Sequence, residues 1–122
     1  MDNRCPFCDP DGILFENELS YSIYDSFPVS RGHTLIIPKR HLGSFFDLDK
    51  EELAACYDMI RRVKEHIDSR FCPDAYNIGI NVGRSAGQSI MHVHIHLIPR
   101  YRGDVPRAKG GVRGVIRDKQ EY

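Results

Sequence analysis

The strongest constraint on how this 122-residue chain can fold is the alternation of residue types from Ile90 to Ile98. Alternate side chains of a β-strand point to opposite faces of a sheet, so a strand here places its histidines on one face and its apolar residues on the other. The histidines are His92, His94 and His96, and the apolar residues beside them are Met91, Val93, Ile95 and Leu97. The segment therefore predicts a strand with one face on a core and an imidazole row on the other.

The remaining periodic segments predict one helix and four further strands. After a possible capping box of Asp49 and Glu52, apolar residues recur at three- and four-residue steps, which is typical of a helix of about five turns. This apolar stripe comprises Leu53, Cys56, Tyr57, Ile60, Val63, Ile67 and Phe71. The other strands are expected at residues 12–17, 21–24, 33–37 and 76–82. Strands on both sides of one long helix favour an α+β fold with a five-stranded antiparallel sheet, in a single domain spanning residues 1–122.

The charge balance argues against a chain built to bind nucleic acid or a membrane surface. There are 17 lysines and arginines and 17 aspartates and glutamates, so the net charge is zero with histidine neutral. Such binding usually needs a positive surplus. No run approaches the roughly 18 apolar residues of a membrane helix, and Met1–Arg4 carry no apolar leader segment. We therefore expect a cytoplasmic protein without nucleic-acid or membrane partners.

The row of histidines has three interpretations. It could be a set of satisfied polar side chains on a solvated face, although a face carrying only histidine is unusual for solvent contact. It could be a three-histidine metal site, but one flat strand holds alternate imidazoles about 7 Å apart, too far to converge easily on one ion. It could be catalytic, because a neutral imidazole attacks electrophiles and its neighbours can donate to a leaving oxygen. His33 is interpreted as a strand-start residue with no chemical role, and His66 as a solvated helix residue.

The loop at residues 83–89 indicates which electrophile such a histidine would meet. Antiparallel pairing brings the Asn81 end of one strand beside the start of the histidine strand, and Gly87-Gln88-Ser89 leads directly into that strand. Glycine lets the backbone approach a ligand closely, and the two side chains after it add uncharged donors. Neutral donors beside a nucleophilic imidazole suit a phosphate oxygen that gains charge in the transition state.

Two of the four cysteines have the spacing of a metal or redox pair. Cys5 and Cys8 are separated by two residues, which suits a zinc site or a redox pair better than a structural disulfide in the cytoplasm. His41 ends a buried strand and is the natural third zinc ligand. Cys56 and Cys72 lie in or beside the predicted helix, where we expect small core side chains.

Residues 87–100 resemble the signature of the histidine-triad (HIT) superfamily. The family pattern is His-φ-His-φ-His-φ-φ, with φ apolar, after a Gly-Gln-Ser or Gly-Gln-Thr loop, and here it reads Gly-Gln-Ser-Ile-Met-His-Val-His-Ile-His-Leu-Ile-Pro-Arg. The segment from Gly32 to His41 is similar to another strand of the family, and Asn81 stands where members carry Asn or Gln. The similarity covers about residues 5–105 and is closer to the Hint branch than to the Fhit branch.

The resemblance implies a homodimeric nucleotide hydrolase or transferase of the HIT-like fold. His94 matches the nucleophile, which attacks the α-phosphorus and forms a covalent nucleotidyl-histidine. His96 matches the residue at the bridging leaving oxygen, and His92 the residue whose carbonyl holds the His94 tautomer. The expected nucleotide contacts are Asn81, Gly87, Gln88 and Ser89 at the phosphate, Asp25 at the ribose, and Leu14, Phe15, Ile23 and Tyr24 around the base. The expected substrate is a purine nucleotide derivative, either a phosphoramidate or a dinucleoside polyphosphate.

The resemblance also implies structural zinc. In members with an N-terminal Cys-x-x-Cys, the first histidine of the triad, here His92, is the fourth ligand after the two cysteines and the histidine matching His41. The metal-free alternative has His41 as a hydrogen-bond partner of His92. Three functional alternatives remain: a non-catalytic zinc or nucleotide-binding module, a dinucleoside polyphosphate phosphorylase, and a metallohydrolase.

The chain ends in a basic segment rich in glycine and arginine, at about residues 100–122. Seven positive and three negative side chains lie in residues 99–122. A substrate with several phosphates carries charge beyond the α-phosphate, so residues 100–113 are expected to recognise an anionic leaving group. The alternative is a solvated or dimer-building tail.

Overall fold

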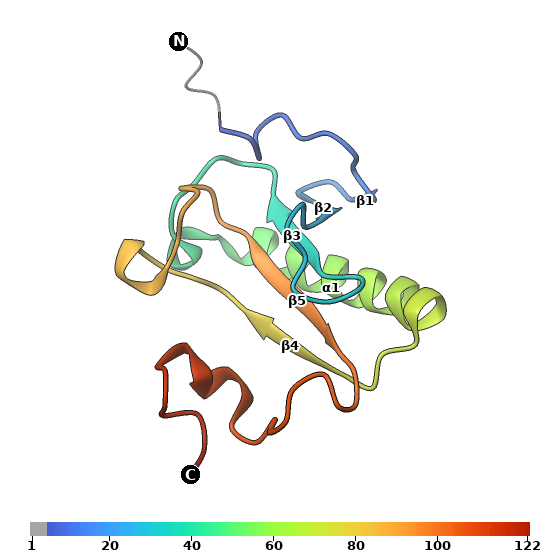
Figure 1. Cartoon of the computed structure of the whole chain (residues 1–122). Coiled ribbons are helices and arrows are strands. Elements are labelled where there is room, and N and C mark those ends of the chain that lie inside the picture. Colours follow the sequence, from blue (N-terminus) through green and yellow to red (C-terminus); the bar gives the residue numbers. More distant parts are fainter. Residues whose placement is uncertain (1–4) are drawn as a thin grey trace.

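The computed structural model describes residues 5–122, which form a five-stranded antiparallel sheet with one long α-helix against it (Figure 1). The strand order is β1-β2-β3-β5-β4, and every pairing is antiparallel. The strands are β1 (Phe15–Glu16), β2 (Ser20–Tyr24), β3 (Thr34–Pro38), β4 (Ala75–Gly79) and β5 (Ile95–Arg100), and the helix is α1 (Lys50–Phe71). Short 3₁₀ helices are η1 (Phe45–Asp47), η2 (Arg84–Ala86) and η3 (Gly111–Val115). The predicted α+β fold is confirmed. The first four residues, where no leader segment was expected, lie outside the described residues.

Helix α1 begins at the predicted capping box and packs on one face of the sheet. The Asp49 side chain accepts from the backbone N–H of Glu52, and the Glu52 side chain accepts from that of Asp49. The core between helix and sheet is formed by Cys56, Met59, Val63 and Ile67 from α1 with Ile36, Ile95 and Leu97 from the strands. The opposite face of the sheet is not covered by α1 (Figure 1).

The predicted apolar stripe of α1 was partly wrong. Met59 is buried, whereas Leu53 and Tyr57 are 47% and 58% exposed, because the buried row is centred on Cys56, Val63 and Ile67. Cys72 is exposed as well, since it caps the helix in the left-handed conformation with φ 52° instead of extending the stripe.

The histidine strand is shorter than its sequence pattern. Strand β5 begins at Ile95, which pairs with Ile36, and the same register continued would place Ile37 beside His94 and Pro38 beside Val93. Proline has no N–H to donate, so the ladder stops there. The preceding residues are held by a loop instead, through the Val93 N–H and the carbonyl of Leu42, 2.8 Å apart. Strand β4 likewise ends at Gly79, before the predicted residue 82.

Within residues 5–122, no helix combines the length and apolar character needed to cross a membrane.

Candidate functional site

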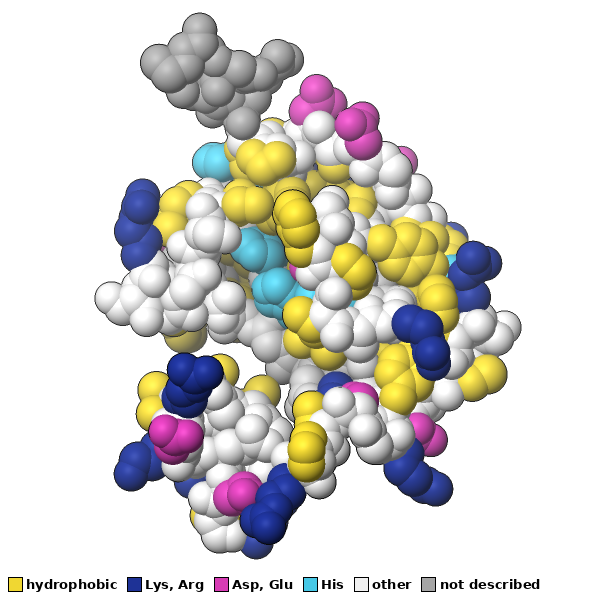
Figure 2. Space-filling view, viewed as in Figure 1, with side chains coloured by type: hydrophobic (Ala, Val, Ile, Leu, Met, Phe, Trp, Pro, Cys, Tyr) yellow, Lys and Arg dark blue, Asp and Glu magenta, His cyan; other side chains and the backbone are white. Residues whose placement is uncertain are grey.

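The histidines gather in the middle of the sheet face opposite α1 (Figure 2). The His94 ring is buried, and its Nδ1 lies 2.8 Å from the carbonyl oxygen of His92. A carbonyl only accepts, so Nδ1 carries the proton and Nε2 keeps its lone pair. The His94 and His96 ring centres are 5.3 Å apart. The contact predicted between the His92 carbonyl and His94 is therefore present, and it leaves His94 with a free, unprotonated nitrogen.

The three histidines of the row do not converge on one point. Nδ1 of His92 faces the cysteines, whereas Nδ1 of His94 is used by a backbone carbonyl, and Nδ1 of His96 meets His33. One metal ion bound by all three is therefore excluded by this geometry.

His33 belongs to the site, contrary to its interpretation as a chemically silent residue. Its Nδ1 accepts from the Val29 N–H at 3.1 Å, so a neutral His33 carries its proton on Nε2. That Nε2 lies 3.0 Å from Nδ1 of His96 and 3.4 Å from Oδ2 of Asp25. His96 thus accepts at Nδ1, and in its neutral form it holds a proton on Nε2, ready to donate.

The signal that could have revealed His33 is strand pairing. Leu35 is the direct partner of His96 across β3 and β5, and His33 lies two residues earlier on the same face. The alternation within residues 33–37 was visible in the sequence, but the register that brings the two strands together was not.

Burial keeps these imidazoles neutral. It lowers the pKa of His33, an effect that Asp25 partly opposes. Burial also lowers the pKa of His96, and the neighbouring His94 and His33 lower it further. At neutral pH both side chains therefore favour the uncharged forms that the hydrogen bonds require.

Stability should fall on acidification because of these lowered pKa values. Just below the ordinary histidine pKa of about 6.5, these two side chains are protonated in the unfolded chain but still neutral in the folded protein, because folding lowers their pKa values. The free energy of unfolding is thus highest above that pH and declines as the pH drops toward the lowered folded values. Urea unfolding at pH 7.5, 6.5 and 5.5 checks this, and a His33→Gln variant should show a shallower decline. Parallel pH profiles for the two proteins would contradict the assignment.

Gln88 supports the loop between β4 and β5 and does not offer its amide to a ligand. Its Oε1 accepts from the Gly83 N–H at 2.8 Å, and its Nε2 donates to the carbonyls of Gly43 and Ile90 at 2.7 and 3.1 Å. Both amide hydrogens are used within the protein, so the side chain has no amide hydrogen left for the expected phosphate contact. Gln88 is buried, and its hydrogen bonds hold the loop in place.

The other expected phosphate contacts are brought together. Asn81 lies on the histidine side, with its Nδ2 3.9 Å from the position a Cβ on Gly87 would take. Gly87 has φ 96°, a conformation that favours glycine, and Ser89 is exposed beside it. Asp25 keeps Oδ2 near His33 while Oδ1 accepts from the Phe27 N–H at 2.9 Å. Asn81 and Ser89 are therefore the neutral side chains available at the loop.

Of the four residues expected around the base, only Leu14 and Ile23 lie on the histidine face of the sheet. Ile23 packs with the cluster on that face, and Leu14 adjoins it through the backbone pairing of β1 and β2. Phe15 and Tyr24 have the opposite parity and turn toward α1, where both contact His66. The structure therefore does not bring these two side chains to the other expected base contacts, and His66 is half-buried by the same contacts.

The cysteine pair meets two histidines in a geometry that fits a tetrahedral metal. Nδ1 of His92 lies 3.4 Å from Sγ of Cys5, 3.6 Å from Sγ of Cys8 and 3.3 Å from Nδ1 of His41. Nδ1 of His41 is 3.2 Å from Sγ of Cys8. Zinc bonds of about 2.3 Å to sulfur and about 2.0–2.1 Å to nitrogen place ligand atoms about 3.3–3.6 Å apart. His92 also donates from Nε2 to the carbonyl of Pro38 at 2.7 Å, which directs its Nδ1 lone pair at the cluster.

The loop that carries Cys5 and Cys8 also contacts His94. Phe7, between the two cysteines, is buried, and its ring centre lies 5.1 Å from that of His94 in an edge contact. Its carbonyl accepts a hydrogen bond from the Tyr21 hydroxyl. The cysteine loop and His94 are therefore packed as one unit.

A cleft of about 480 Å³ opens beside His96. His33, Asn81 and Asn77 line its sheet side, and η3 of the C-terminal segment lines the other. The histidines in Figure 2 lie above the separation between the body of the molecule and this segment. The buried histidines thus adjoin a space that can hold a small molecule.

Comparison with known proteins finds relatives that are similar over most of this chain. An uncharacterized HIT-like protein of Methanocaldococcus jannaschii is 37% identical over 124 residues, covering 94% of both chains. A bis(5'-adenosyl)-triphosphatase of Dictyostelium discoideum is 38% identical, covering 75% of this chain and 62% of its own.

Solved structures agree. A HIT family protein from Bacillus anthracis has a TM-score of 0.78 at 32% identity, covering 85% of this chain and 78% of its own. A zinc-bound histidine triad family protein from Mycobacterium smegmatis has a TM-score of 0.74 at 34% identity, covering 82% and 77%. The family model described as "HIT domain" matches residues 8–103, which include the cysteine loop from Cys8 onward, both histidine strands and the loop between β4 and β5. A chain with this sheet, this match and these relatives belongs to the histidine-triad (HIT) family.

Proposed function

We propose that this protein hydrolyses or transfers the nucleotidyl group of a purine nucleotide derivative, through a covalent intermediate on His94. The observation that carries the proposal is the 2.8 Å contact between Nδ1 of His94 and the His92 carbonyl. It fixes the tautomer whose Nε2 lone pair is free to attack, without a general base to remove a proton.

The reaction divides into two balanced steps. Nε2 of His94 attacks the α-phosphorus, a P–N bond forms, and the bond to the leaving group breaks with its electron pair going to that group. His96, neutral and protonated on Nε2, donates to the departing atom, because His33 occupies its Nδ1. Water or another protic acceptor then attacks the phosphorus and gives its proton to Nε2 of His96, while the P–N bond breaks with its electron pair returning to Nε2 of His94. Asn81 and Ser89 would contact the α-phosphate oxygens.

The remaining nucleotide contacts follow from the same face. Asp25 would accept from the ribose hydroxyls with its Oδ2 edge, beside His33. Leu14 and Ile23 would contact the purine. Support for a nucleotide substrate comes from the relatives, since the Dictyostelium protein is named as a dinucleoside triphosphatase.

Cys5, Cys8, His41 and His92 would hold zinc with a structural role. Four protein ligands leave no open coordination position, so the ion would order the N-terminal loop and supply no reactive water. His92 would link the two parts, with its side chain on the metal and its carbonyl on His94.

We further propose a homodimer. Leu53 and Tyr57 on α1 and Ile78 on the edge strand β4 are all roughly half exposed, at 47%, 58% and 51%. Exposed apolar side chains on neighbouring elements mark a surface suited to association.

The proposed function is tested by trapping the intermediate. Purified protein is mixed with an adenosine phosphoramidate or diadenosine polyphosphate, quenched without acid, digested and analysed by mass spectrometry. We expect an added adenylyl group on the peptide containing His94, together with turnover. Nucleotide binding with neither adduct nor turnover would favour a binding module instead.

The rival with a specific structural basis is a metal-dependent hydrolase, because Asp25, His33 and His96 also lie within 4.8 Å of one another. It predicts rapid loss of activity with a chelator. A structural zinc predicts slow, partial loss that follows unfolding.

A further inference from the structure

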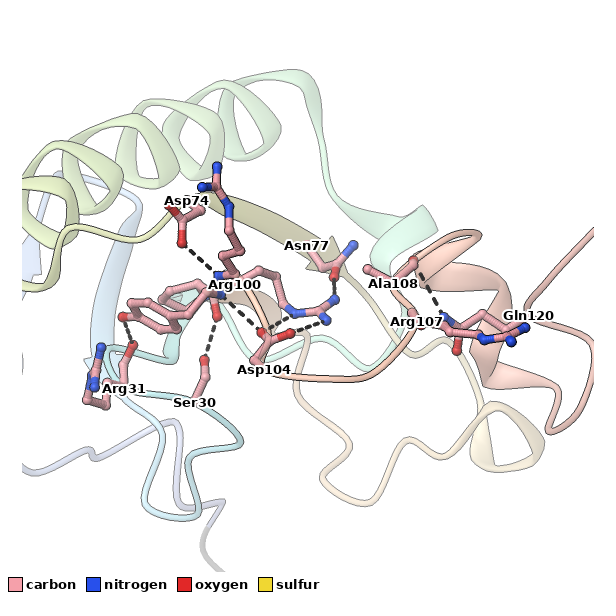
Figure 3. Close-up of polar contacts among 12 residues, drawn as sticks. Ser30, Arg31, Asp74, Asn77, Arg100, Asp104, Arg107, Ala108 and Gln120 are labelled. Carbon is pink, nitrogen blue, oxygen red and sulfur yellow. Dashed lines mark hydrogen bonds and ion pairs between the residues drawn. The ribbon is translucent and has the colours of Figure 1, made fainter.

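Two arginines among the described residues each bind one carboxylate with two nitrogens, and the two pairs differ in what they join. Arg100 donates to Asp104 at 2.8 and 2.9 Å and to the Asn77 side chain at 2.6 Å (Figure 3). This pair closes a local turn after β5, and it engages an arginine that was expected to meet a leaving group. Arg40 donates from Nε and Nη2 to Glu52 at 2.8 and 2.7 Å. The second pair therefore ties the segment after β3 to the first turn of α1.

The Glu52 end of the second pair is fixed in place. The Glu52 side chain is 5% exposed, and it also accepts from the Asp49 N–H at 3.0 Å. Arg40 donates from Nη2 to the Asp47 carbonyl as well, at 3.2 Å. The hydrogen bonds from Arg40 lower the pKa of Glu52 to about 2 against the opposing effect of burial, so the pair stays ionised at the pH of an activity assay. Helix α1 and η1 thus hold Arg40 through three hydrogen bonds.

The segment that contains Arg40, residues 38–43, supplies carbonyls to the chain that runs from loop 83–89 into β5. Strand β3 ends at Pro38, so the rest of this segment lies outside the sheet ladder. It is held instead by its contacts with neighbouring loops and by the tie to α1. The three bonds join the carbonyl of Pro38 to Nε2 of His92 at 2.7 Å, that of Leu42 to the Val93 N–H at 2.8 Å and that of Gly43 to Nε2 of Gln88 at 2.7 Å.

These bonds fix the backbone that sets the His94 tautomer. The His92 side chain is held by the 38–43 segment, and the His92 carbonyl lies 2.8 Å from Nδ1 of His94. A hydrogen bond weakens steeply as its angle and distance depart from ideal, so a displaced carbonyl no longer keeps the proton on Nδ1. A chain of direct contacts therefore runs from Glu52 through Arg40 and the 38–43 segment to the nucleophile.

We propose that Arg40 and Glu52 are positioning residues, which act through residues 38–43 to hold the His92 carbonyl and loop 83–89 in place around the reacting phosphorus. Both side chains lie at the start of α1, and α1 covers the sheet face opposite the histidines, so neither touches the substrate. The inference rests on the proposed function and adds to it the residues that keep the nucleophile aligned.

The first test measures kcat and KM of Arg40→Gln with an adenosine phosphoramidate or diadenosine polyphosphate. We expect kcat to fall about 10- to 100-fold, the scale of a misplacement of about 1 Å, and KM to change less than about threefold, because the proposed ribose and base contacts come from around β1 and β2. Arg40→Lys should recover part of kcat, since a lysine keeps one charged contact but not the two-nitrogen geometry.

The matched control is Lys39→Gln. Lys39 is the neighbouring cation of the same segment, and it pairs with Glu16 at 2.9 Å, with both side chains exposed and away from α1. Exposed pairs contribute little, so this variant should keep kcat within about twofold of wild type.

A second measurement observes His94 without any substrate. In protein labelled with ¹⁵N in its imidazoles, NMR distinguishes protonated from unprotonated ring nitrogens, and the His94 signals are assigned by their loss in His94→Ala. The wild type should show the proton on Nδ1, and Arg40→Gln should show a mixture of the two tautomers. The zinc content of Arg40→Gln should equal that of the wild type, because the four ligand side chains remain.

Two further variants separate positioning from stability. Glu52→Gln retains a capping box, and when combined with Arg40→Gln it should lower kcat no further than Arg40→Gln alone, because both residues act through one pair. Val63→Ala truncates a buried side chain of the same helix away from residues 38–43. It should lower Tm but keep both kcat and the His94 tautomer.

The inference is overturned if Arg40→Gln keeps kcat within about threefold of wild type or leaves the His94 tautomer unchanged. An equal loss of kcat in Val63→Ala would also overturn it, because stability alone would then explain the effect. Loss of zinc in parallel with kcat would do the same by placing the effect at the metal site. If the wild type gives neither turnover nor adduct with any proposed substrate, the proposed function fails, and the tautomer measurement alone decides this inference.

Discussion

Replacing His94 with alanine is expected to reduce kcat/KM by about 10⁴-fold or more, the scale seen when an attacking group is removed. The loss follows because no other described imidazole offers a free lone pair at that place: Nδ1 of His92 faces the cysteines and Nδ1 of His96 meets His33. The ring is buried against Phe7 and His96, so thermal unfolding is measured alongside and the assay is run well below the Tm of the variant. Steady-state kinetics with an adenosine phosphoramidate measure the effect.

Two controls separate chemistry from folding in that experiment. His66→Ala removes a half-buried histidine that contacts Phe15 and Tyr24 on the α1 side, and it should keep activity within about threefold of wild type. Added imidazole should restore part of the activity of the His94 variant, because a small nucleophile can enter the space left by the ring. Activity of His94→Ala within about threefold of wild type would refute the nucleophile assignment.

Replacing Cys8 with serine is expected to remove the zinc and lower Tm by about 10 °C or more, because a structural site contributes its binding energy to folding. The Sγ of Cys8 contacts both His41 and His92, so its loss leaves the cluster without a tetrahedral set. Metal analysis should give about one zinc per wild-type chain and far less for the variant. Calorimetry gives the change in Tm.

Cys72→Ser is the matched control, because Cys72 is also exposed and lies at the end of α1, away from the cluster. It should retain zinc and the wild-type Tm within a few degrees. Wild-type protein grown with zinc but holding none, or a Cys8 variant with unchanged Tm, would remove the case for a structural metal.

Local sequence patterns were enough to predict the long helix and the existence of the strands in this fold. The period-two alternation around His94 predicted a strand with two unlike faces, and the Asp49–Glu52 pair marked the start of α1. These features depend on residues close in sequence, so periodicity and capping chemistry specify them. The cysteine spacing likewise placed Cys5 and Cys8 together, which the fold then brought to His41 and His92.

Only the tertiary structure decided which side chains share the site. Strand register brought His33 to His96, and strand parity turned Phe15 and Tyr24 away toward α1. Long-range hydrogen bonding to Gly43 consumed the Gln88 amide, which looked free in the sequence. The basic tail was visible from composition, but the pairing of Arg100 with Asp104 depends on how the chain folds back after β5. A sequence specifies which groups are present and their local spacing, whereas their partners are set by contacts between residues far apart in the chain, which no local pattern encodes.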